Sequence, residues 1–333
     1  MNNNLDATLV LADLPTDLAW KFGGFTNGLE PLTLPHPRSP DGADGYGRPG
    51  ATDVDAYGSV CRLIQLAGAA GSPLGPDGHR QPESELYWFR WITGHQVSFI
   101  SWRLMAQLIA DAVSGRLTVE AALAGLCPCI RVYTAMLLYT GSCPPGTYHE
   151  VIRPSMRLRH PSFSGSWAPD YWPVRSLLRG GRLPFALSAG SGDVRRAVAL
   201  HQLVHDGIAA KLVPDGRSLL RQSGVRGLDL KLLHVIYDNY FLTLRAPVSR
   251  HEVIAQLLRR LVAIAQDVAA NGLHPAPDEN SGELPEELQT SEVASCEENF
   301  IDILFEAANC ATCLPAGELL ASAAGNGALR HSR

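Results

Sequence analysis

The chain has 333 residues, 46% hydrophobic and 18% charged, with a formal net charge of −5. This balance predicts a globular protein with a large core and excludes the basic field that nucleic-acid binding requires. No apolar run approaches the length of a membrane span, and Met1–Asp6 has no signal-peptide pattern. We therefore expect no membrane partner, a cytoplasmic location and reduced thiols, with Cys310 and Cys313 as an incidental pair.

The composition changes twice along the chain. Residues 1–80 are rich in Pro, Gly and Asp, which predicts a loop-rich N-terminal arm. Residues 81–274 predict a helical core, and residues 275–333 predict an acidic linker, a C-terminal helix and a frayed tail. These three regions are interpreted as parts of one domain.

Apolar residues at helical spacing predict the helices of the core, and no alternating strand pattern is present. We therefore expect an all-α fold. The predicted helices span Glu85–Val113, Thr118–Leu126, Ile130–Tyr139, 192–213, Gly227–Leu244, Ser249–Asn271 and Ser291–Asn309. Cys127-Pro128-Cys129 is expected to separate the second helix from the third, and Ser249 and Glu252 predict a capping box.

His201 and His205 lie one helical turn apart on a stripe that is otherwise Val, Ala, Ile and Leu, so both are expected to face the core. Buried imidazoles need partners, because an unpaired buried polar group costs about 1–3 kcal/mol. Two interpretations remain open. The histidines are core residues bonded to backbone or water, or they bind a metal. A zinc protease is excluded, since Gln202 stands where its helix needs Glu.

A second histidine lies in an aromatic stripe. Trp91, His95, Phe99 and Trp102 share one helix face, which is typical of ordinary core packing and also of a pocket for a flat ligand. In the second case His95 is the group that handles a proton. Arg131 begins an otherwise uncharged helix with no acidic residue within one turn. A buried arginine demands an anion, either a distant acidic residue or a substrate carboxylate.

The chain resembles the histidine-ligated haem aromatic oxygenases, the superfamily of tryptophan 2,3-dioxygenase, in three segments. In chain order they are the stripe from Trp91 to Trp102, the helix of Arg131 and the helix of His201. Trp91-Ile-Thr-Gly-His95-Gln96 is similar to the Phe-x-x-x-His-Gln of the distal side. Arg131, with Met136-Leu-Leu138 and Gly141, resembles the helix that grips the substrate carboxylate, and His201-Gln-Leu-Val resembles the proximal helix. The Gly-Thr-Gly-Gly-Ser-Ser loop of the dioxygenases is absent from Asp215–Gly224. The chain therefore looks closer to the tyrosine hydroxylases of natural-product biosynthesis.

The resemblance implies a helical bundle of the tryptophan 2,3-dioxygenase type and non-covalent haem b. It implies hydroxylation of L-tyrosine, or a close derivative, at the ring 3-position to give L-DOPA, with hydrogen peroxide or dioxygen plus a reductant. His201 would be the iron ligand, with His205 as supporting residue or alternative ligand, and His95 the acid–base group. The substrate-binding residues would be Arg131, Trp91, Phe99, Trp102 and Ser223, and a homodimer is expected. The alternatives are an indole amino acid dioxygenase and a cofactor-free helical binding protein.

Overall fold

The structure is a computed structural model that describes residues 20–22, 25–27, 29–36, 83–185, 190–213, 219, 229–274 and 284–313. Most of the expected N-terminal arm and acidic linker, the tail after residue 313 and the predicted contact Ser223 lie outside these residues. The described part is an all-α bundle, as the sequence predicts. Its long helices are α2 (Glu83–Val113), α3 (Val119–Gly141), α7 (Ser191–Leu212), α10 (Arg250–Asn271) and α12 (Phe300–Cys313).

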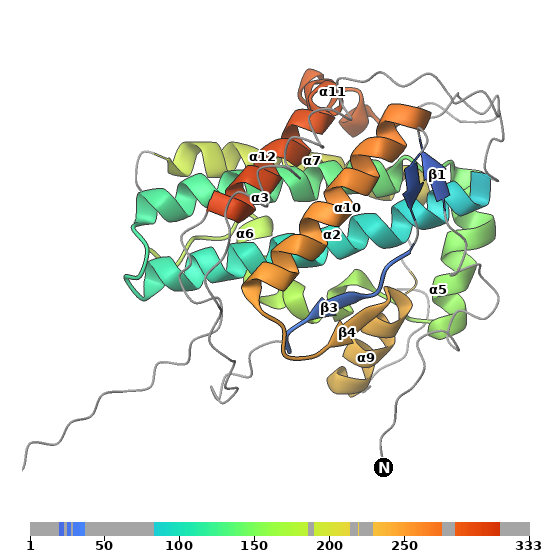
Figure 1. The fold of residues 1–333 in the computed structure, drawn as a ribbon. Coiled ribbons are helices and arrows are strands. Elements are labelled where there is room, and N and C mark those ends of the chain that lie inside the picture. Colours follow the sequence, from blue (N-terminus) through green and yellow to red (C-terminus); the bar gives the residue numbers. More distant parts are fainter. Residues whose placement is uncertain are drawn as a thin grey trace, which may run out of the picture.

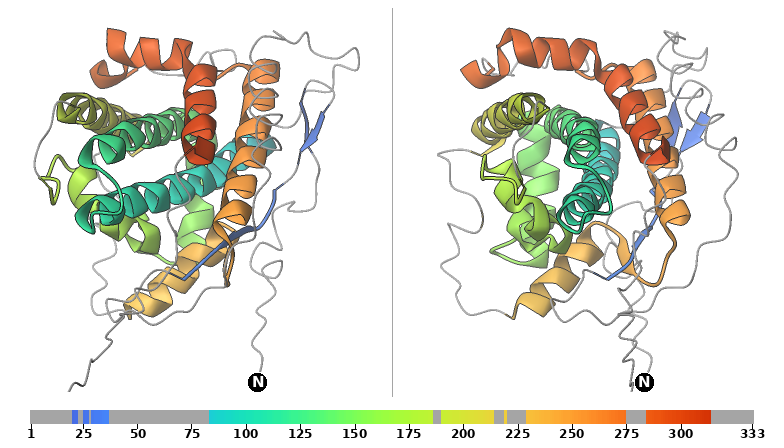
Figure 2. Two further views of the ribbon diagram at one scale, coloured as in Figure 1. Left: turned by 60° about the vertical axis from the view of Figure 1, so that its left-hand side comes forward. Right: turned by 90° about the vertical axis from the view of Figure 1, so that its left-hand side faces the viewer.

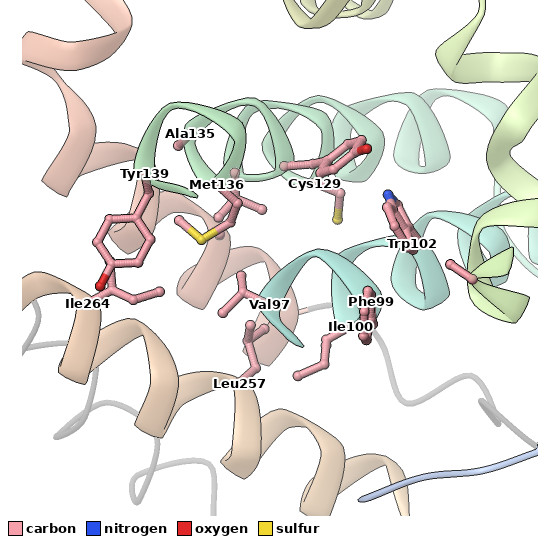
Figure 3. Close-up of a cluster of buried hydrophobic side chains, with 14 of the residues drawn as sticks. Val97, Phe99, Ile100, Trp102, Cys129, Ala135, Met136, Tyr139, Leu257 and Ile264 are labelled. Atoms are coloured by element: carbon pink, nitrogen blue, oxygen red, sulfur yellow. The ribbon is translucent and has the colours of Figure 1, made fainter. Parts of the chain in front are cut away.

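The long helices form two layers. Helices α2, α3 and α7 lie side by side and form one layer. Helices α10 and α12 form the second layer, which packs across one face of the α2–α3 pair (Figures 1 and 2). Figure 3 shows where the apolar faces of α2, α3 and α10 meet, with Val97, Met136 and Leu257 among the buried side chains. This arrangement leaves one side of the α2–α3–α7 layer to be covered by shorter elements.

Helix α3 is a single helix, so the expected break at Cys127-Pro128-Cys129 is wrong. Pro128 lies inside Val119–Gly141, and burial of most of the helix outweighs the local cost of a proline, about 3 kcal/mol. Thr118 caps the start of α3, because its side chain accepts a hydrogen bond from the N–H of Ala121 at 3.2 Å. By length and composition α3 is apolar enough to cross a membrane, but 67% of its most apolar window is buried inside the protein, as in a core helix.

Glycines set the spacing within this layer. A Cβ at Gly94 of α2 would lie 2.5 Å from the Cγ2 of Thr140 in α3. A Cβ at Gly141 would lie 2.3 Å from the Cδ1 of Ile208 in α7. Side chains at these positions would therefore push α2 and α7 away from α3.

Short elements connect α3 to α7, in a segment where the sequence indicated only irregular chain. They are α4 (Pro145–Thr147), η2 (Tyr148–Ile152), α5 (Arg153–Arg159), η3 (Gly165–Trp167), η4 (Pro169–Val174) and α6 (Arg175–Leu178). Prolines at their first turns end one element and start the next, which hides the helical period from a sequence pattern. These elements and α9 (Leu230–Tyr240) cover the open side of the layer.

The remaining differences from the sequence prediction are local. The predicted helix Ser291–Asn309 is two helices, α11 (Ser291–Glu298) and α12, with Asn299 between them. Four three-residue strands, which no pattern indicated, form β1 (Trp20–Phe22) with antiparallel β2 (Phe25–Asn27) and β3 (Leu32–Leu34) with parallel β4 (Thr243–Arg245). The capping box of Ser249 and Glu252 at the start of α10 is confirmed.

A buried ion pair ties α2, α3 and α10 together. Arg90 and Asp267 are both fully buried and share two hydrogen bonds of 2.8 and 3.1 Å. The other guanidinium donors of Arg90 reach the Ser142 hydroxyl and the carbonyls of Gly272 and Leu273. The Tyr139 hydroxyl donates to Asp267 at 2.6 Å. Every N–H of Arg90 is thus used, which makes this pair part of the scaffold.

Candidate active site

Aromatic rings from four elements (α2, α3, η2 and α9) meet next to α2, together with Phe163 and Phe241 from the adjoining loops, on the side covered by the short elements and α9. We call this group the aromatic cluster. Its members are Trp91, His95, Phe99, Trp102, Tyr133, Tyr148, Phe163, Tyr237, Tyr240 and Phe241. The prediction that Trp91, His95, Phe99 and Trp102 share a face is confirmed, because their rings follow one another at 4.2, 6.4 and 5.4 Å.

His95 is held in one tautomer. Its Nδ1 lies 2.6 Å from the carbonyl oxygen of Trp91, one turn earlier in α2. A carbonyl only accepts, so Nδ1 carries the proton and Nε2 of the neutral ring carries the lone pair. Burial lowers the pKa of His95 to about 4, although the bond to the carbonyl opposes that shift. At neutral pH His95 is therefore an unprotonated base with Nε2 as its basic atom.

The His95 ring is also held by two aromatic neighbours. It stacks on Phe241 at 4.4 Å with 19° between the planes, and the Trp91 ring lies 4.2 Å away. The next residue after His95, Gln96, donates a hydrogen bond to the Phe241 carbonyl at 2.9 Å. Leu242 then adopts a left-handed φ of 52°, a conformation that is costly for a non-glycine residue. The backbone is thus held so that the Phe241 ring covers His95.

His201 lies next to the aromatic cluster, at the end of a row of ring contacts that starts at Trp91 and His95 and runs through Phe99 and Trp102 to Tyr133. Its ring is 4.6 Å from Tyr133, which contacts Trp102 at 5.2 Å. Only 4% of His201 is exposed, and its Nδ1 has no hydrogen-bond partner within the described residues. Burial, assisted by His205, lowers the pKa of His201 to about 3. His201 is therefore a neutral, buried imidazole, as the sequence predicts, with an unsatisfied ring nitrogen.

His205 does not share this environment, so the expectation that both histidines face the core is wrong. Its side chain is 58% exposed, and its Nδ1 lies 3.2 Å from Asp206. The buried face of α7 continues from His201 to Val204 and Gly207 rather than to His205, a step of three residues instead of four. This position does not allow His205 to bind a group next to His201 from inside the core.

Arg131 is likewise not the buried, unpaired cation that the sequence indicated. Its side chain is 43% exposed and donates to Glu306 of α12 at 2.7 Å. The partner is 175 residues away in sequence, which is why no acidic residue was visible nearby. The ion pair lies on the α12 side of α3, and it removes the reason for assigning a substrate carboxylate to Arg131.

Unsatisfied buried nitrogen atoms are concentrated around the aromatic cluster. Within the described ranges no regular hydrogen bond is formed by Nε1 of Trp88, Trp91 and Trp102, Nε of Arg159, Nδ1 of His201 or Nε2 of His234. The indoles of Trp91 and Trp102 lie near enough to the hydroxyls of Tyr240 and Tyr133, respectively, to oppose the effect of burial, which raises the pKa of both tyrosines. Trp88 contacts Tyr240 at 5.8 Å, and Arg159 also opposes the rise of the Tyr240 pKa. Each orphaned group costs about 1–3 kcal/mol. Such a concentration indicates a place where a bound molecule supplies the missing partners.

A second network of ion pairs packs against the aromatic cluster. Asp170 of η4 is 4% exposed and accepts hydrogen bonds from Arg103 at 2.7 Å and Arg245 at 2.7 Å. Arg245 also donates to Asp238 of α9 at 2.7 Å. Burial would raise the pKa of Asp170, but the two guanidinium groups outweigh it and the pKa is lowered. The next residue, Tyr171, then lies against Trp102 at 5.2 Å.

Several residues of this site were not identified from the sequence. Phe241 and Tyr133 contact the two histidines directly, and Arg159 supplies an unpaired buried N–H. The aromatic spacing of Tyr237, Tyr240 and Phe241 was the available signal for α9. No sequence pattern around Arg159 indicates that it belongs to the site, because its position depends on the fold of the short elements.

The chemistry of His201 fits a residue that would hold the iron of a haem. A metal ligand must be a neutral imidazole, and the lowered pKa of His201 keeps it so. In the part of the chain that the structure describes, there is no group of three His, Cys, Asp or Glu side chains that could hold a metal ion without a cofactor. A single buried imidazole would suit the iron of a haem, because the porphyrin supplies the other ligands. Among the described residues, Nδ1 of His201 forms no hydrogen bond to a carbonyl or carboxylate.

Comparison with known families finds a match over part of the chain. Residues 51–189 match the family described as SfmD 3-methyl-L-tyrosine peroxygenase. The match supports a peroxygenase of the tyrosine-modifying kind. It includes α2 and α3, and hence His95 and Tyr133, and it ends before α7 and His201. A search of curated proteins found no match.

Proposed function

We propose that the protein is a haem-dependent oxygenase that hydroxylates L-tyrosine, or a close derivative, at the ring 3-position in secondary-metabolite biosynthesis. The name of the matching family supports a tyrosine derivative as substrate and hydrogen peroxide as oxidant. With peroxide, one oxygen atom enters the ring C–H bond and the other leaves as water. A peroxygenase thus needs no external reductant.

The observation that carries the proposal is the environment of His95. Its Nδ1–H donates a hydrogen bond to the Trp91 carbonyl, so Nε2 is the ring atom that can accept a proton. Hydroxylation next to a phenol is assisted when a base takes the phenolic proton, because the phenolate ring is richer in electrons at the ortho carbon. A positioned acid–base group contributes about 10²–10⁴-fold to a rate. His95 is assigned this role, and it would accept the proton at Nε2.

The aromatic cluster is assigned to the substrate ring. Trp91, Phe99 and Trp102 offer faces and edges against which a phenol packs, and pairs of this kind contribute about 0.5–1.5 kcal/mol each. Because Phe99 and Trp102 are almost fully buried, they also keep water from the reacting ring.

His201 is assigned to the cofactor. When bound there, haem would supply the activation of peroxide that the amino acid side chains lack. The side chain contributes a neutral imidazole at the end of the row of rings, and Tyr133 holds its plane. His205, exposed on the outer side of α7, is not included in the site.

Arg159 replaces Arg131 as the proposed cation for the substrate carboxylate. It is partly buried, and its Nε has no partner within the described ranges. It lies at the edge of the cluster, close to Tyr240, whose hydroxyl is 2.8 Å from Ser155. Since a hydrogen bond to a charged group contributes about 1.5–3 kcal/mol, Arg159→Met should lower kcat/KM about tenfold or more, mainly through KM.

The test is the mass of the product. Haem-loaded protein is incubated with L-tyrosine, or with 3-methyl-L-tyrosine, in which only the equivalent carbon on the other side of the hydroxyl group carries a hydrogen atom. Hydrogen peroxide is supplied in one reaction, and oxygen and ascorbate in another. The proposal predicts a product heavier by one oxygen atom, with more turnover on peroxide. A product heavier by two oxygen atoms from L-tryptophan would instead identify an indole dioxygenase, and no product from any of these amino acids would contradict the proposal.

A further inference from the structure

The packing of α12 on α3 brings two thiols together at a place that takes no part in the proposed site. The Cys310 thiol of α12 donates to the carbonyl oxygen of Gly125 in α3 at 3.6 Å. Gly125 and Cys129 are four residues apart and share one face of α3. A helical side chain lies over the turn before its own Cα, so the side chain of Cys129 extends toward Gly125 and the Cys310 sulfur.

The two sulfurs form an unequal pair. The neighbouring Cys129 thiol lowers the pKa of Cys310 against the opposing effect of burial. The Cys310 sulfur, together with burial, in turn raises the pKa of Cys129. Cys129 is 3% exposed, whereas Cys310 is only partly buried. Cys310 is therefore the better nucleophile and the more accessible one, and Cys129 holds its proton.

We propose that Cys310 and Cys129 form a peroxide-driven disulfide that joins α12 to α3. The Cys310 thiolate attacks one peroxide oxygen, the O–O bond breaks, and Cys310 becomes a sulfenic acid while the other oxygen leaves as water. The Cys129 sulfur then attacks the Cys310 sulfur and displaces the second oxygen, which also leaves as water. Two thiols lose two electrons and two protons in all, and one peroxide becomes two waters.

The other thiols near this pair are less suitable. Cys127 is two residues from Cys129, about 200° around α3, and so faces away from the Gly125 carbonyl. Cys313 is exposed and three residues from Cys310 on the same helix. A disulfide within one helical turn strains the helix, whereas Cys129 and Cys310 belong to separate helices that pack together.

The test uses full-length, haem-free protein, so that a failure of haem binding leaves it intact. Protein reduced with a phosphine is treated with one equivalent of hydrogen peroxide, blocked with N-ethylmaleimide and digested without reduction. The number of free thiols should fall by two per chain, and the digest should contain one cross-linked peptide pair that joins Cys129 to Cys310. Dithiothreitol should restore both thiols and reverse a rise in the Tm of the oxidised protein.

Two variants separate the roles of the sulfurs. In Cys129→Ser, Cys310 should stop at the sulfenic acid and be labelled by dimedone, whereas Cys310→Ser should leave Cys129 as a thiol. Cys313→Ser is the matched control on the same helix and should form the disulfide as the natural protein does. Cys129→Ala replaces Cys129→Ser if the serine variant loses its circular dichroism spectrum. A disulfide to Cys127 or Cys313, or no disulfide at all, would overturn the inference.

Discussion

Two buried polar regions on opposite sides of the α2–α3 pair differ in how completely their atoms are paired. Around Arg90, each guanidinium N–H has an acceptor, and Asp267 accepts from Arg90, Tyr139 and Asn271. Around the aromatic cluster, several buried ring and guanidinium nitrogens have no partner among the described residues. Complete pairing marks a region that stabilises the fold, and incomplete pairing marks a region that binds something else.

The same helix contributes to both regions. Arg90 and Trp91 are neighbours in α2, and their side chains leave the helix about 100° apart. One enters the ion pair with α10, and the other enters the cluster beside His95. Substitutions at neighbouring positions should therefore change either stability or chemistry, and the predictions below test that separation.

The largest effect is expected for His201→Ala. Loss of the buried imidazole removes the proposed iron ligand, so the variant should bind no haem with a histidine-ligated spectrum. His205→Ala, one turn later and exposed, is the matched control and should bind haem normally. Haem titration followed by visible absorption distinguishes the two, and the reverse result would transfer the ligand role to His205.

His95→Gln should keep haem and lose turnover. Glutamine retains a polar side chain but cannot take a proton, so kcat should fall by about 10²–10⁴-fold. Since the His95 pKa is about 4, the wild-type rate should not fall between pH 8 and pH 6 through protonation of this residue. Steady-state kinetics across that range measure both effects. Unchanged turnover in the variant would remove His95 from the chemistry.

Arg90→Met should destabilise the protein without changing the site. It leaves the Asp267 carboxylate buried without its cation, and breaking such a pair costs about 3–5 kcal/mol. Urea unfolding monitored by circular dichroism measures the loss in the free energy of unfolding. The folded fraction should retain its haem affinity, so a variant that folds well but fails to bind haem would break the separation of the two regions.

Acid should destabilise the haem-free protein through the two buried histidines. Their pKa values in the folded state are about 4 for His95 and about 3 for His201, below the ordinary value of 6.5. The unfolded chain therefore binds protons that the folded chain does not, and stability falls as pH drops below 6.5 toward 4. The slope approaches about 1.4 kcal/mol per pH unit for each histidine. Urea unfolding between pH 7 and pH 5 should show a flatter slope in His95→Gln.

The smallest effect is expected for Arg131→Ala. An exposed ion pair such as Arg131–Glu306 contributes about 0–1 kcal/mol, and the variant should keep the KM for tyrosine. Glu306→Ala should have the same small effect on stability. A large rise of KM in Arg131→Ala alone would restore the carboxylate role that the sequence suggested.

The sequence predicts most of this fold because helical periodicity is a local property. Helices α2, α7 and α10 and the capping box at Ser249 follow from spacing alone. So does the shared face of Trp91, His95, Phe99 and Trp102. Tertiary packing decides the rest. It keeps α3 continuous through Pro128, pairs Arg131 with a glutamate from α12, and places Phe241 on His95. It also turns His205 outward, since the buried face of α7 depends on its neighbours.

The most direct test is the visible absorption spectrum of the protein titrated with haem, before and after addition of L-tyrosine. The account predicts a Soret band at one haem per chain. L-tyrosine should shift this band in the wild-type protein, because the substrate ring enters the cluster beside the haem. His95→Gln should keep the band, and His201→Ala should lose it. Haem that gives no Soret band with the folded wild-type protein would contradict the central claim, and the cluster would then be ordinary core packing.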